Sequence, residues 1–391
     1  MWIDRIDVFL VRLPLASPFV IADTVIDHCD TVYLRLESEG CSGWGEITPG
    51  NHPYLTSAWS QGVYFSIREN LIPLIAKTGY VEDGDKLDEI FAPVKGNRHA
   101  KAAFDLALWD LIAKKEEKPL WKALGGSKKP IEVGFTFDRE KDPDLFYKQL
   151  FRVFEEGYQR ITLKLRPGWD LQVVGAVRAE APALMKIQID PEGALDLESQ
   201  SEILYRLEDF MPSLLEQPLN QTEYVGHAML QDQMHIPIGL DEAIKTLPQA
   251  NIAFDLQCAE VFSMKTGRVG GLTTGKKIHD AAKTHDVVCY GGFDIQSSLA
   301  YRHLLALSSL PNFTLPCDYI RFDEVFQEEP VPPILSYLKT IPNKNKSEEG
   351  QEETLSFRAV DLWDEPGIGV EPDPAILEKH LLDRVSWFRE K

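Results

Sequence analysis

Apolar residues follow two different rhythms along most of this chain. From residue 131 onward, short apolar segments alternate with longer segments in which apolar residues recur every three or four positions. The first rhythm predicts buried strands and the second predicts amphipathic helices. The expected strands cover residues 131–137, 161–165, 185–190, 214–218, 236–241, 260–265, 287–291 and 313–316, and the expected helices cover residues 143–156, 171–181, 199–210, 224–233, 248–256, 272–285 and 297–307. This strict alternation favours an α/β fold in which a parallel sheet closes as a (β/α)7β TIM-like barrel.

The N-terminal part of the chain has another pattern. Residues 1–45 alternate apolar and polar positions in the manner of strands. The period then changes, and residues 58–78, 84–93 and 98–118 show helical spacing. Strands followed by helices predict a small α+β domain over the first 128 residues.

The composition excludes two classes of partner. The 391 residues include 61 acidic and 41 basic side chains, so the formal net charge is −20 at pH 7. A surface this acidic repels phosphate backbones and anionic lipids, and no apolar run is long enough to span a bilayer. We therefore expect neither a nucleic-acid partner nor a membrane partner.

The polar segment over residues 343–353 is expected to form a surface loop.

The cysteines and the N-terminus indicate the compartment. The five cysteines are scattered, odd in number and without paired spacing, which is typical of reduced thiols rather than of a disulfide framework. Charged residues interrupt the apolar N-terminal stretch, so we expect a strand there rather than a signal peptide. Both observations predict a cytoplasmic protein.

Five charged side chains stand at the ends of successive expected strands. They are Lys164, Asp190, Glu216, Asp241 and Lys265, and successive members lie 24 to 26 residues apart, which is one strand–helix unit. The C-terminal ends of parallel barrel strands meet at one mouth, where the loops between strands and helices gather. The spacing therefore predicts that all five side chains converge at that mouth.

Three converging carboxylates repel one another unless a divalent cation lies among them. An all-oxygen set suits Mg²⁺, or alternatively Mn²⁺, and the chain has no HExxH motif or paired cysteines for zinc. We expect Asp190, Glu216 and Asp241 to bind this cation. Lys164 and Lys265 belong to the second and sixth strands, on opposite sides of the mouth, where a nearby cation lowers the pKa of a lysine. The pattern predicts removal of a proton next to a carboxylate, with the metal stabilising the enolate.

Several longer motifs are distributed along nearly the whole chain. They occupy residues 12–19, 43–46, 156–164, 167–170, 265–271, 310–316 and 366–371. Together these motifs resemble the enolase superfamily, in its muconate-lactonizing subgroup, and within it the branch of o-succinylbenzoate synthases and N-succinylamino acid racemases. The resemblance implies a capping domain over residues 1–128, a barrel over residues 129–322, and a C-terminal segment over residues 323–391 that returns to the capping domain.

The resemblance also implies an activity. The leading prediction is that of an o-succinylbenzoate synthase, which dehydrates 2-succinyl-6-hydroxy-2,4-cyclohexadiene-1-carboxylate in menaquinone biosynthesis. Lys164 would remove the proton next to the carboxylate, and Lys265 would stabilise the enolate as a cation. The alternatives are racemisation of N-acylamino acids, which needs both lysines as bases, and another activity of the subgroup, such as that of a cycloisomerase or a dipeptide epimerase. A non-catalytic barrel that keeps a metal site is disfavoured, since it has no use for two opposed lysines.

The chain departs from the family pattern at the mouth. The second strand usually carries Lys-x-Lys, whereas this chain has Thr162-Leu163-Lys164, so the first lysine is replaced. That lysine would lower the pKa of Lys164 by like-charge repulsion. Pro191-Glu192 stands where the family usually has Ala-Asn, and the seventh strand ends Gly-Gly-Phe-Asp rather than Gly-Gly-Met-Leu-Glu.

Substrate contacts are expected around the mouth. Loops over residues 17–21 and 51–54 are expected to close over it and to exclude water. Arg268 is expected to position a substrate carboxylate or to lower the pKa of Lys265, with a loop salt bridge as the alternative. The expected ligand is a small carboxylate, and a homo-oligomer is left open. The expected substrate-binding residues are Arg268, Thr162, Ser17, Tyr54, Gly292 and Asp294.

Overall fold

The chain is described here by a computed structural model. It describes residues 1–21, 24–54, 56–138, 142–165, 171–292, 294–342 and 354–390. The expected surface loop over residues 343–353 and the motif at residues 167–170 lie outside these ranges. Within the described ranges, no helix combines the length and the apolar character that crossing a membrane requires.

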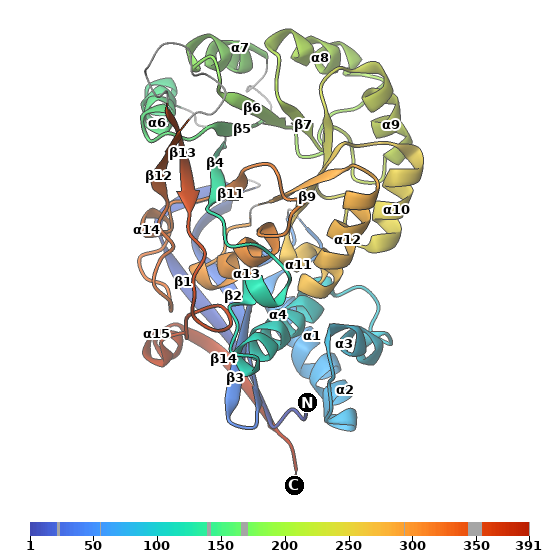
Figure 1. Cartoon of the computed structure of the whole chain (residues 1–391), viewed down its shortest axis with the longest axis vertical. Helices are drawn as coiled ribbons and strands as arrows, with labels where there is room; N and C mark the ends of the chain where they lie inside the picture. The colour runs from blue at the N-terminus through green and yellow to red at the C-terminus, as the bar shows by residue number, and fades with distance from the viewer. Residues whose placement is uncertain are drawn as a thin grey trace.

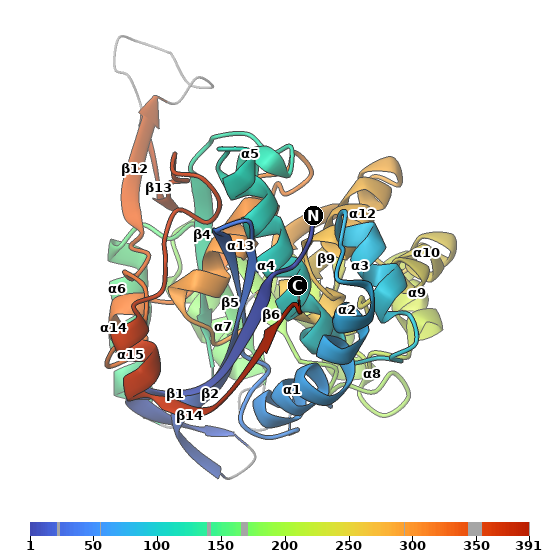
Figure 2. The same cartoon turned by 90° about the horizontal axis from the view of Figure 1, so that it is seen from below.

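The first strands of the chain form an antiparallel sheet that the C-terminal strand completes. β1 (Arg5–Ile21), β2 (Thr24–Ser38) and β3 (Cys41–Ile47) follow one another, and β14 (Leu381–Phe388) pairs with the free edge of β1. Figure 2 shows β14 running beside β1, although the two strands come from opposite ends of the sequence. The last strand of the chain is therefore part of the N-terminal sheet.

Helices follow β3 along the chain. They are α1 (Ser60–Ser66), a π-helical segment (Ile67–Leu71), α2 (Ile72–Thr78), α3 (Gly84–Phe91), α4 (Arg98–Lys115) and α5 (Leu120–Ala123). Of these, α4 and α1 pack directly against the sheet. α4 lies close against β3 because β3 has glycines where the two backbones meet. A Cβ atom on Gly43 would lie 2.2 Å from the carbonyl oxygen of Ala107, and one on Gly45 would lie 2.4 Å from that of Ala103. The two glycines therefore permit the close contact between helix and sheet.

Eight parallel strands form the second part of the fold, in the upper half of Figure 1. They are β4 (Ile131–Phe137), β5 (Arg160–Lys164), β6 (Lys186–Asp190), β7 (Leu214–Glu216), β8 (Ile238–Leu240), β9 (Val261–Met264), β10 (Val288–Gly291) and β11 (Cys317–Tyr319). Each strand from β4 to β10 pairs with the next, and β11 pairs with β4. A bridge between Cys289 and Phe313 joins the segment before β11 to β10, so the sheet closes into a barrel.

Helices follow the barrel strands along the chain. They are α6 (Pro143–Glu155), α7 (Leu171–Glu180), α8 (Ser201–Arg206) with a 3-10 segment (Leu207–Phe210), α9 (Tyr224–Gln233), α10 (Leu247–Leu256), α11 (Thr266–Val269), α12 (Leu272–Thr284) and α13 (Ser298–Ser308), with α14 (Phe322–Val325) after β11. The observed alternation agrees with the expected one except at the last strand. The strand expected over residues 313–316 is wrong, because this segment makes a single bridge to β10, at Phe313, and the strand β11 begins after it at Cys317. The N–H of Phe313 still bonds back to Leu310 in a turn, and Pro316 has no N–H to donate to a neighbouring strand.

The C-terminal segment divides between the two parts of the fold. β12 (Tyr337–Pro342) and β13 (Thr354–Val360) form a hairpin, and β13 pairs with β4 of the barrel rather than with the N-terminal sheet. Figure 2 shows this hairpin standing out from the body of the molecule. The stretch after α15 (Pro374–Lys379) joins the N-terminal sheet through β14. Phe326 also bridges Leu15 of β1, and Glu371 accepts a hydrogen bond from the indole N–H of Trp44 on β3.

A buried carboxylate ties the two parts together. Glu46, at the end of β3, accepts hydrogen bonds from the backbone N–H groups of Ser297 (2.8 Å) and Ala300 (3.0 Å) at the start of α13. A side chain from the N-terminal sheet thereby caps a barrel helix. Burial raises the pKa of Glu46, and the hydrogen bonds oppose that effect.

Candidate metal and proton-transfer site

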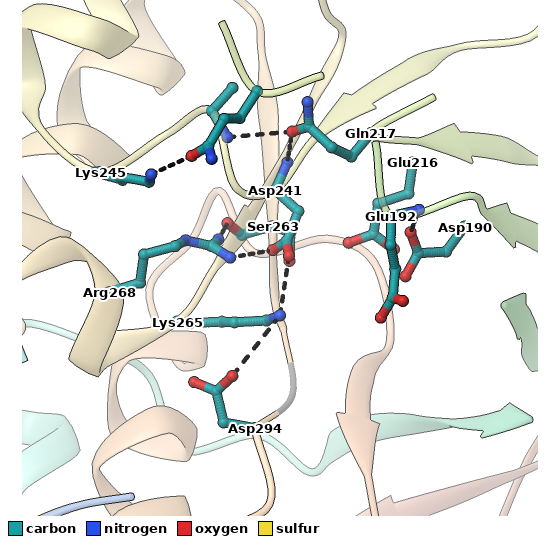
Figure 3. Close-up of polar contacts among 12 residues, drawn as sticks. Asp190, Glu192, Glu216, Gln217, Asp241, Lys245, Ser263, Lys265, Arg268 and Asp294 are labelled. Carbon is teal, nitrogen blue, oxygen red and sulfur yellow. Dashed lines mark hydrogen bonds and ion pairs between the residues drawn. The ribbon is translucent and has the colours of Figure 1, made fainter. Parts of the chain in front are cut away.

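The five charged side chains expected at successive strand ends, which we call the ladder, all lie at the C-terminal ends of barrel strands. Lys164, Asp190 and Glu216 are the last residues of β5, β6 and β7, and Asp241 and Lys265 directly follow β8 and β9. Lys164 pairs with Asp190 in the register between β5 and β6. Consecutive parallel strands therefore bring the five residues to one mouth of the barrel, and Figure 3 shows four of them together there.

The two lysines occupy opposite sides of that mouth. β5 is the second and β9 the sixth of the eight barrel strands, so four strand positions separate them in either direction around the barrel. The three carboxylates occupy the intervening strands β6, β7 and β8 on one of these two paths. A small molecule at the mouth would thus have one lysine on each side.

Asp241 is held between two cations. Its carboxylate lies 2.9 Å from Nζ of Lys265 and 2.7 Å from the guanidinium of Arg268. Gln217 fixes its backbone, because the Gln217 side-chain oxygen accepts hydrogen bonds from the N–H groups of Asp241 (3.0 Å) and Ala243 (3.1 Å). Burial opposes ionisation of Asp241, but Arg268 and Lys265 outweigh it and hold its pKa below the usual range.

Asp190 and Glu192 share Lys164. Nζ of Lys164 lies 3.5 Å from Asp190 and forms a close ion pair with Glu192. The backbone N–H of Glu192 donates to Asp190 at 2.8 Å, and Glu192 has a φ of +52°, a left-handed conformation that is uncommon for a residue with a side chain. Burial raises the pKa of Asp190 to about 6, with Lys164 opposing and Glu192 and Asp241 adding to the effect. The pair that replaces the family's Ala-Asn therefore adds a fourth carboxylate beside Lys164.

Glu216 differs from the other two carboxylates of the ladder. It is 4 % exposed and forms no ion pair with any residue that the structure describes. Its Oε2 accepts a hydrogen bond from the neutral side chain of Gln188 at 2.5 Å. Burial, together with the charges of Asp190 and Asp241, raises the pKa of Glu216 well above its usual range.

The donor set fits a hard divalent cation by its chemistry, because the three neighbouring acidic groups offer only oxygen ligands and the negative charges of Asp190 and Asp241 raise the pKa of Glu216. As the side chains stand, no three acidic, histidine or cysteine groups in the described part of the chain are arranged to hold a metal ion. Asp190 is directed to Lys164, and Asp241 to Lys265 and Arg268. Metal binding by these residues therefore requires that a cation replace the lysine contacts.

The carboxylates also set the charge of the lysines. Burial lowers the pKa of Lys164, but Asp190 and Glu192 outweigh it and raise that pKa. Burial likewise opposes the charge on Lys265, while Asp241 and Asp294 raise its pKa well above the usual range. With the protein groups alone, both lysines are ammonium ions at neutral pH.

Three of the expected substrate-binding residues lie beside the ladder, and substrate binding by them stays a prediction. Arg268 is buried, and besides Asp241 it donates to the carbonyl oxygen of Ser263 at 2.7 Å. Asp294 lies 3.8 Å from Nζ of Lys265. A Cβ atom on Gly292 would lie 2.2 Å from Oγ of Ser263 and 3.1 Å from Cε of Lys265. Glycine at this position therefore leaves room for the Lys265 side chain.

The other three expected substrate-binding residues form no hydrogen bond or ion pair with the ladder in the part of the chain that the structure describes. Thr162 is buried inside the barrel and accepts a hydrogen bond from Arg160 at 2.8 Å. Ser17 is exposed on β1, and Tyr54 is exposed and stacked on His52 at a ring distance of 5.0 Å. Asn51 fastens the 51–54 loop to β2 through two hydrogen bonds. The loop expected over residues 17–21 is wrong, because these residues belong to β1, and residues 19–21 pair with β2. Closure of either segment over the mouth stays a prediction.

Sequence reasoning missed a polar group inside the barrel. It consists of Arg160, Gln188, Tyr290 and Asp318, all buried and linked by hydrogen bonds or an ion pair. A signal was available in part, because Arg160 and Gln188 stand an even number of residues before Lys164 and Asp190. Side chains two or four positions apart on a strand share a face. Polar residues at such positions in apolar strands indicate an inward-facing network.

Comparisons with known proteins extend over both parts of the fold. A family model described as the mandelate racemase / muconate lactonizing enzyme N-terminal domain matches residues 5–125, and one described as enolase C-terminal domain-like matches residues 146–376. An o-succinylbenzoate synthase of Geobacillus kaustophilus is 32% identical over 337 residues, covering 85% of this chain and 89% of the relative. An N-succinylamino acid racemase of Thermus thermophilus is 31% identical over 329 residues, covering 84% and 88%.

A solved structure agrees with the architecture. The crystal structure of an enolase superfamily member from Listeria innocua superposes with a TM-score of 0.88 at 26% identity and covers 100% of both chains. The expected α/β fold, a barrel with an α+β capping domain, is thereby confirmed.

Proposed function

This chain belongs to the enolase superfamily, in its muconate-lactonizing subgroup, and on that premise we propose that it is an o-succinylbenzoate synthase. The observation that carries the proposal is the placement of two lysines on opposite sides of three strand-end carboxylates. Relatives with the synthase name match this chain over most of its length. The reaction would be the dehydration of 2-succinyl-6-hydroxy-2,4-cyclohexadiene-1-carboxylate to an aromatic product.

We propose that Asp190, Glu216 and Asp241 hold the metal on which the superfamily depends, typically Mg²⁺. When bound, Mg²⁺ would replace the contacts that Asp190 and Asp241 make with cations and would stabilise negative charge on the substrate carboxylate. The all-oxygen donor set supports this assignment, and so do the raised pKa values of Asp190 and Glu216, since burial and mutual repulsion leave negative charge to be neutralised.

The lysines would then divide the proton chemistry. Lys164 would take the proton from the carbon next to the carboxylate, and Lys265 would remain protonated and stabilise the developing negative charge across the mouth. The hydroxyl group would take that proton from the Lys164 ammonium and leave as water with the electron pair of its carbon–oxygen bond, so that Lys164 returns to the free amine and the ring becomes aromatic. The buried positions of Asp190, Glu216 and Asp241 support a site with little water, in which such charge interactions are strong.

Racemisation of N-succinylamino acids is the second candidate. It is supported by the same pair of opposed lysines, because a base on each face permits removal of the proton from one enantiomer and its return to the other face. The Thermus thermophilus relative carries the racemase name at nearly the same identity as the synthase from Geobacillus kaustophilus. Arg268, buried against Asp241 three residues after Lys265, lies beside the second base.

We also propose that residues 1–128, together with the end of the C-terminal segment, act as the capping domain over a barrel of residues 129–322. The pairing of β14 with β1 and the Glu46 cap on α13 support this division. The β12–β13 hairpin is excepted, because it pairs with the barrel strand β4.

Purified protein should convert the cyclohexadiene carboxylate to o-succinylbenzoate with added Mg²⁺, and EDTA should stop the reaction. Chromatography of the product is the measurement. N-succinyl amino acids should be tested in parallel by loss of optical rotation. Product from the first substrate alone supports a dedicated synthase, and product from both supports a protein with two activities. No turnover of the cyclohexadiene carboxylate under conditions where the protein binds metal would contradict the proposal.

A further inference from the structure

The barrel interior below the mouth contains a buried arginine. Arg160, on β5, is 3 % exposed, and its guanidinium donates to Thr162 (2.8 Å) and Gln188 (2.9 Å) and forms an ion pair with Asp318 at 2.5 Å. It also lies 5.3 Å from the ring centre of Tyr290. A planar group with several donors can meet these partners at once, which a lysine could not do.

The neighbouring strand leaves room for this guanidinium. A Cβ atom on Gly134, on β4, would lie 2.4 Å from Nε of Arg160 and 2.7 Å from its central carbon. Thr162 contributes an acceptor where the family usually has lysine, so that a neutral side chain rather than a second cation occupies this position beside Arg160. Gly134 and Thr162 therefore both favour one position of the Arg160 side chain.

Arg160 fixes the orientation of the Gln188 amide. Arginine has only donors, so the amide oxygen of Gln188 must face it and the amide nitrogen must face the other way. That nitrogen donates to Oε2 of Glu216 at 2.5 Å and to the hydroxyl oxygen of Tyr290 at 3.0 Å. The direction of the hydrogen bond to Glu216 thus follows from the N–H donors of Arg160, two strands away.

This arrangement sets Glu216 apart within the ladder. Asp190 and Asp241 are contacted by cations, whereas Gln188 is neutral and leaves the negative charge of Glu216 uncompensated. We propose that Gln188, oriented by Arg160, is a positioning residue for Glu216: it holds Oε2 and leaves Oε1 to a divalent cation. The inference rests on the metal site of the proposed function, and it adds residues of the barrel interior to that site.

Gln188→Met tests the proposal, because methionine keeps the length and volume of the side chain but cannot donate to Glu216. Mn²⁺ binding to the metal-free protein, measured by calorimetry and by the electron paramagnetic resonance spectrum of the bound ion, should weaken about 10- to 100-fold, as is typical when a hydrogen-bond partner of a metal ligand is lost. Thr136→Val is the matched control, since it removes a barrel-strand hydroxyl that has no hydrogen-bond partner in the structure. Its Mn²⁺ affinity and spectrum should equal those of the wild type.

Gly134→Ala provides a second, independent variant. It deletes no polar group but places a methyl group against Arg160, so it should also weaken Mn²⁺ binding. Circular dichroism identifies which variants are folded. Wild-type affinity and an unchanged spectrum in either folded variant would overturn the proposal, and so would a wild-type protein that does not bind Mn²⁺. A wild-type protein that binds Mn²⁺ but does not dehydrate the substrate would sink the proposed function and leave the role of Gln188 open to the same test.

Discussion

Replacing Lys164 with alanine should lower the rate of dehydration by about 10²-fold or more, which is the contribution of an essential general base. The variant loses the amine at the end of β5 that contacts the carboxylates of Asp190 and Glu192. The rate constant for dehydration at saturating substrate is the measurement. Lys265→Ala should have a comparable effect, because it removes the cation that lies 2.9 Å from Asp241 on the opposite side.

Lys245→Ala is the control for both variants. Lys245 follows β8 in the same loop as Asp241, but its amine contacts Gln221 rather than a ladder carboxylate. Its replacement should leave the rate within a few-fold of wild type. Near-normal dehydration by Lys164→Ala would mean that another group is the base and that Thr162-Leu163-Lys164 is misassigned.

Replacing Asp190, Glu216 or Asp241 with alanine should lower metal-dependent activity on the order of 10³-fold. The reason is that loss of one metal ligand removes several kcal/mol of charge stabilisation. Each variant removes one of three neighbouring strand-end carboxylates. In crystals soaked with Mn²⁺, anomalous scattering should place the ion within about 2.0–2.4 Å of oxygens from all three residues.

Glu260→Gln is the matched control for the metal variants, because Glu260 is an exposed acid that precedes β9, away from its C-terminal end. It should bind Mn²⁺ as the wild type does. A metal ion found elsewhere, or full metal binding after replacement of all three carboxylates, would refute the assignment.

Period and spacing predict most of this fold because the barrel repeats one unit. Strands that are buried on both faces are continuous apolar segments, and such a segment is recognised without knowledge of distant residues. The 24- to 26-residue spacing of the ladder holds for the same reason, since each step is one strand, one helix and their loops. The last strand does not follow this rule, because the apolar segment between the prolines at positions 311 and 316 makes a single bridge to β10, at Phe313, and the strand itself begins at Cys317.

Contacts across the barrel could not be predicted in this way. The ion pair of Glu192 with Lys164 depends on the left-handed backbone at Glu192, which is not apparent in the residue type. The ion pair of Arg160 with Asp318 joins residues 158 positions apart, through the closure of β11 on β4. Such partners are set by strand order and not by local pattern. The sequence therefore predicts that Arg268, Asp294 and Gly292 lie at the mouth, but not which side chains they contact there.

Enantiomer-resolved exchange of the α proton in D₂O tests most directly the claim that two opposed lysines remove a proton next to a carboxylate. N-succinyl amino acids of each hand are incubated with wild type, Lys164→Ala and Lys265→Ala, and deuterium at the α carbon is measured by NMR. Where both lysines act as bases, wild type should exchange both enantiomers, and each variant should lose exchange of a different one. Full dehydration of the cyclohexadiene carboxylate with no exchange of either enantiomer in wild type would leave a dedicated synthase and remove the racemase alternative. Equal exchange of both enantiomers by either variant would contradict the account, and exchange lost for the same enantiomer in both variants would contradict the opposed placement.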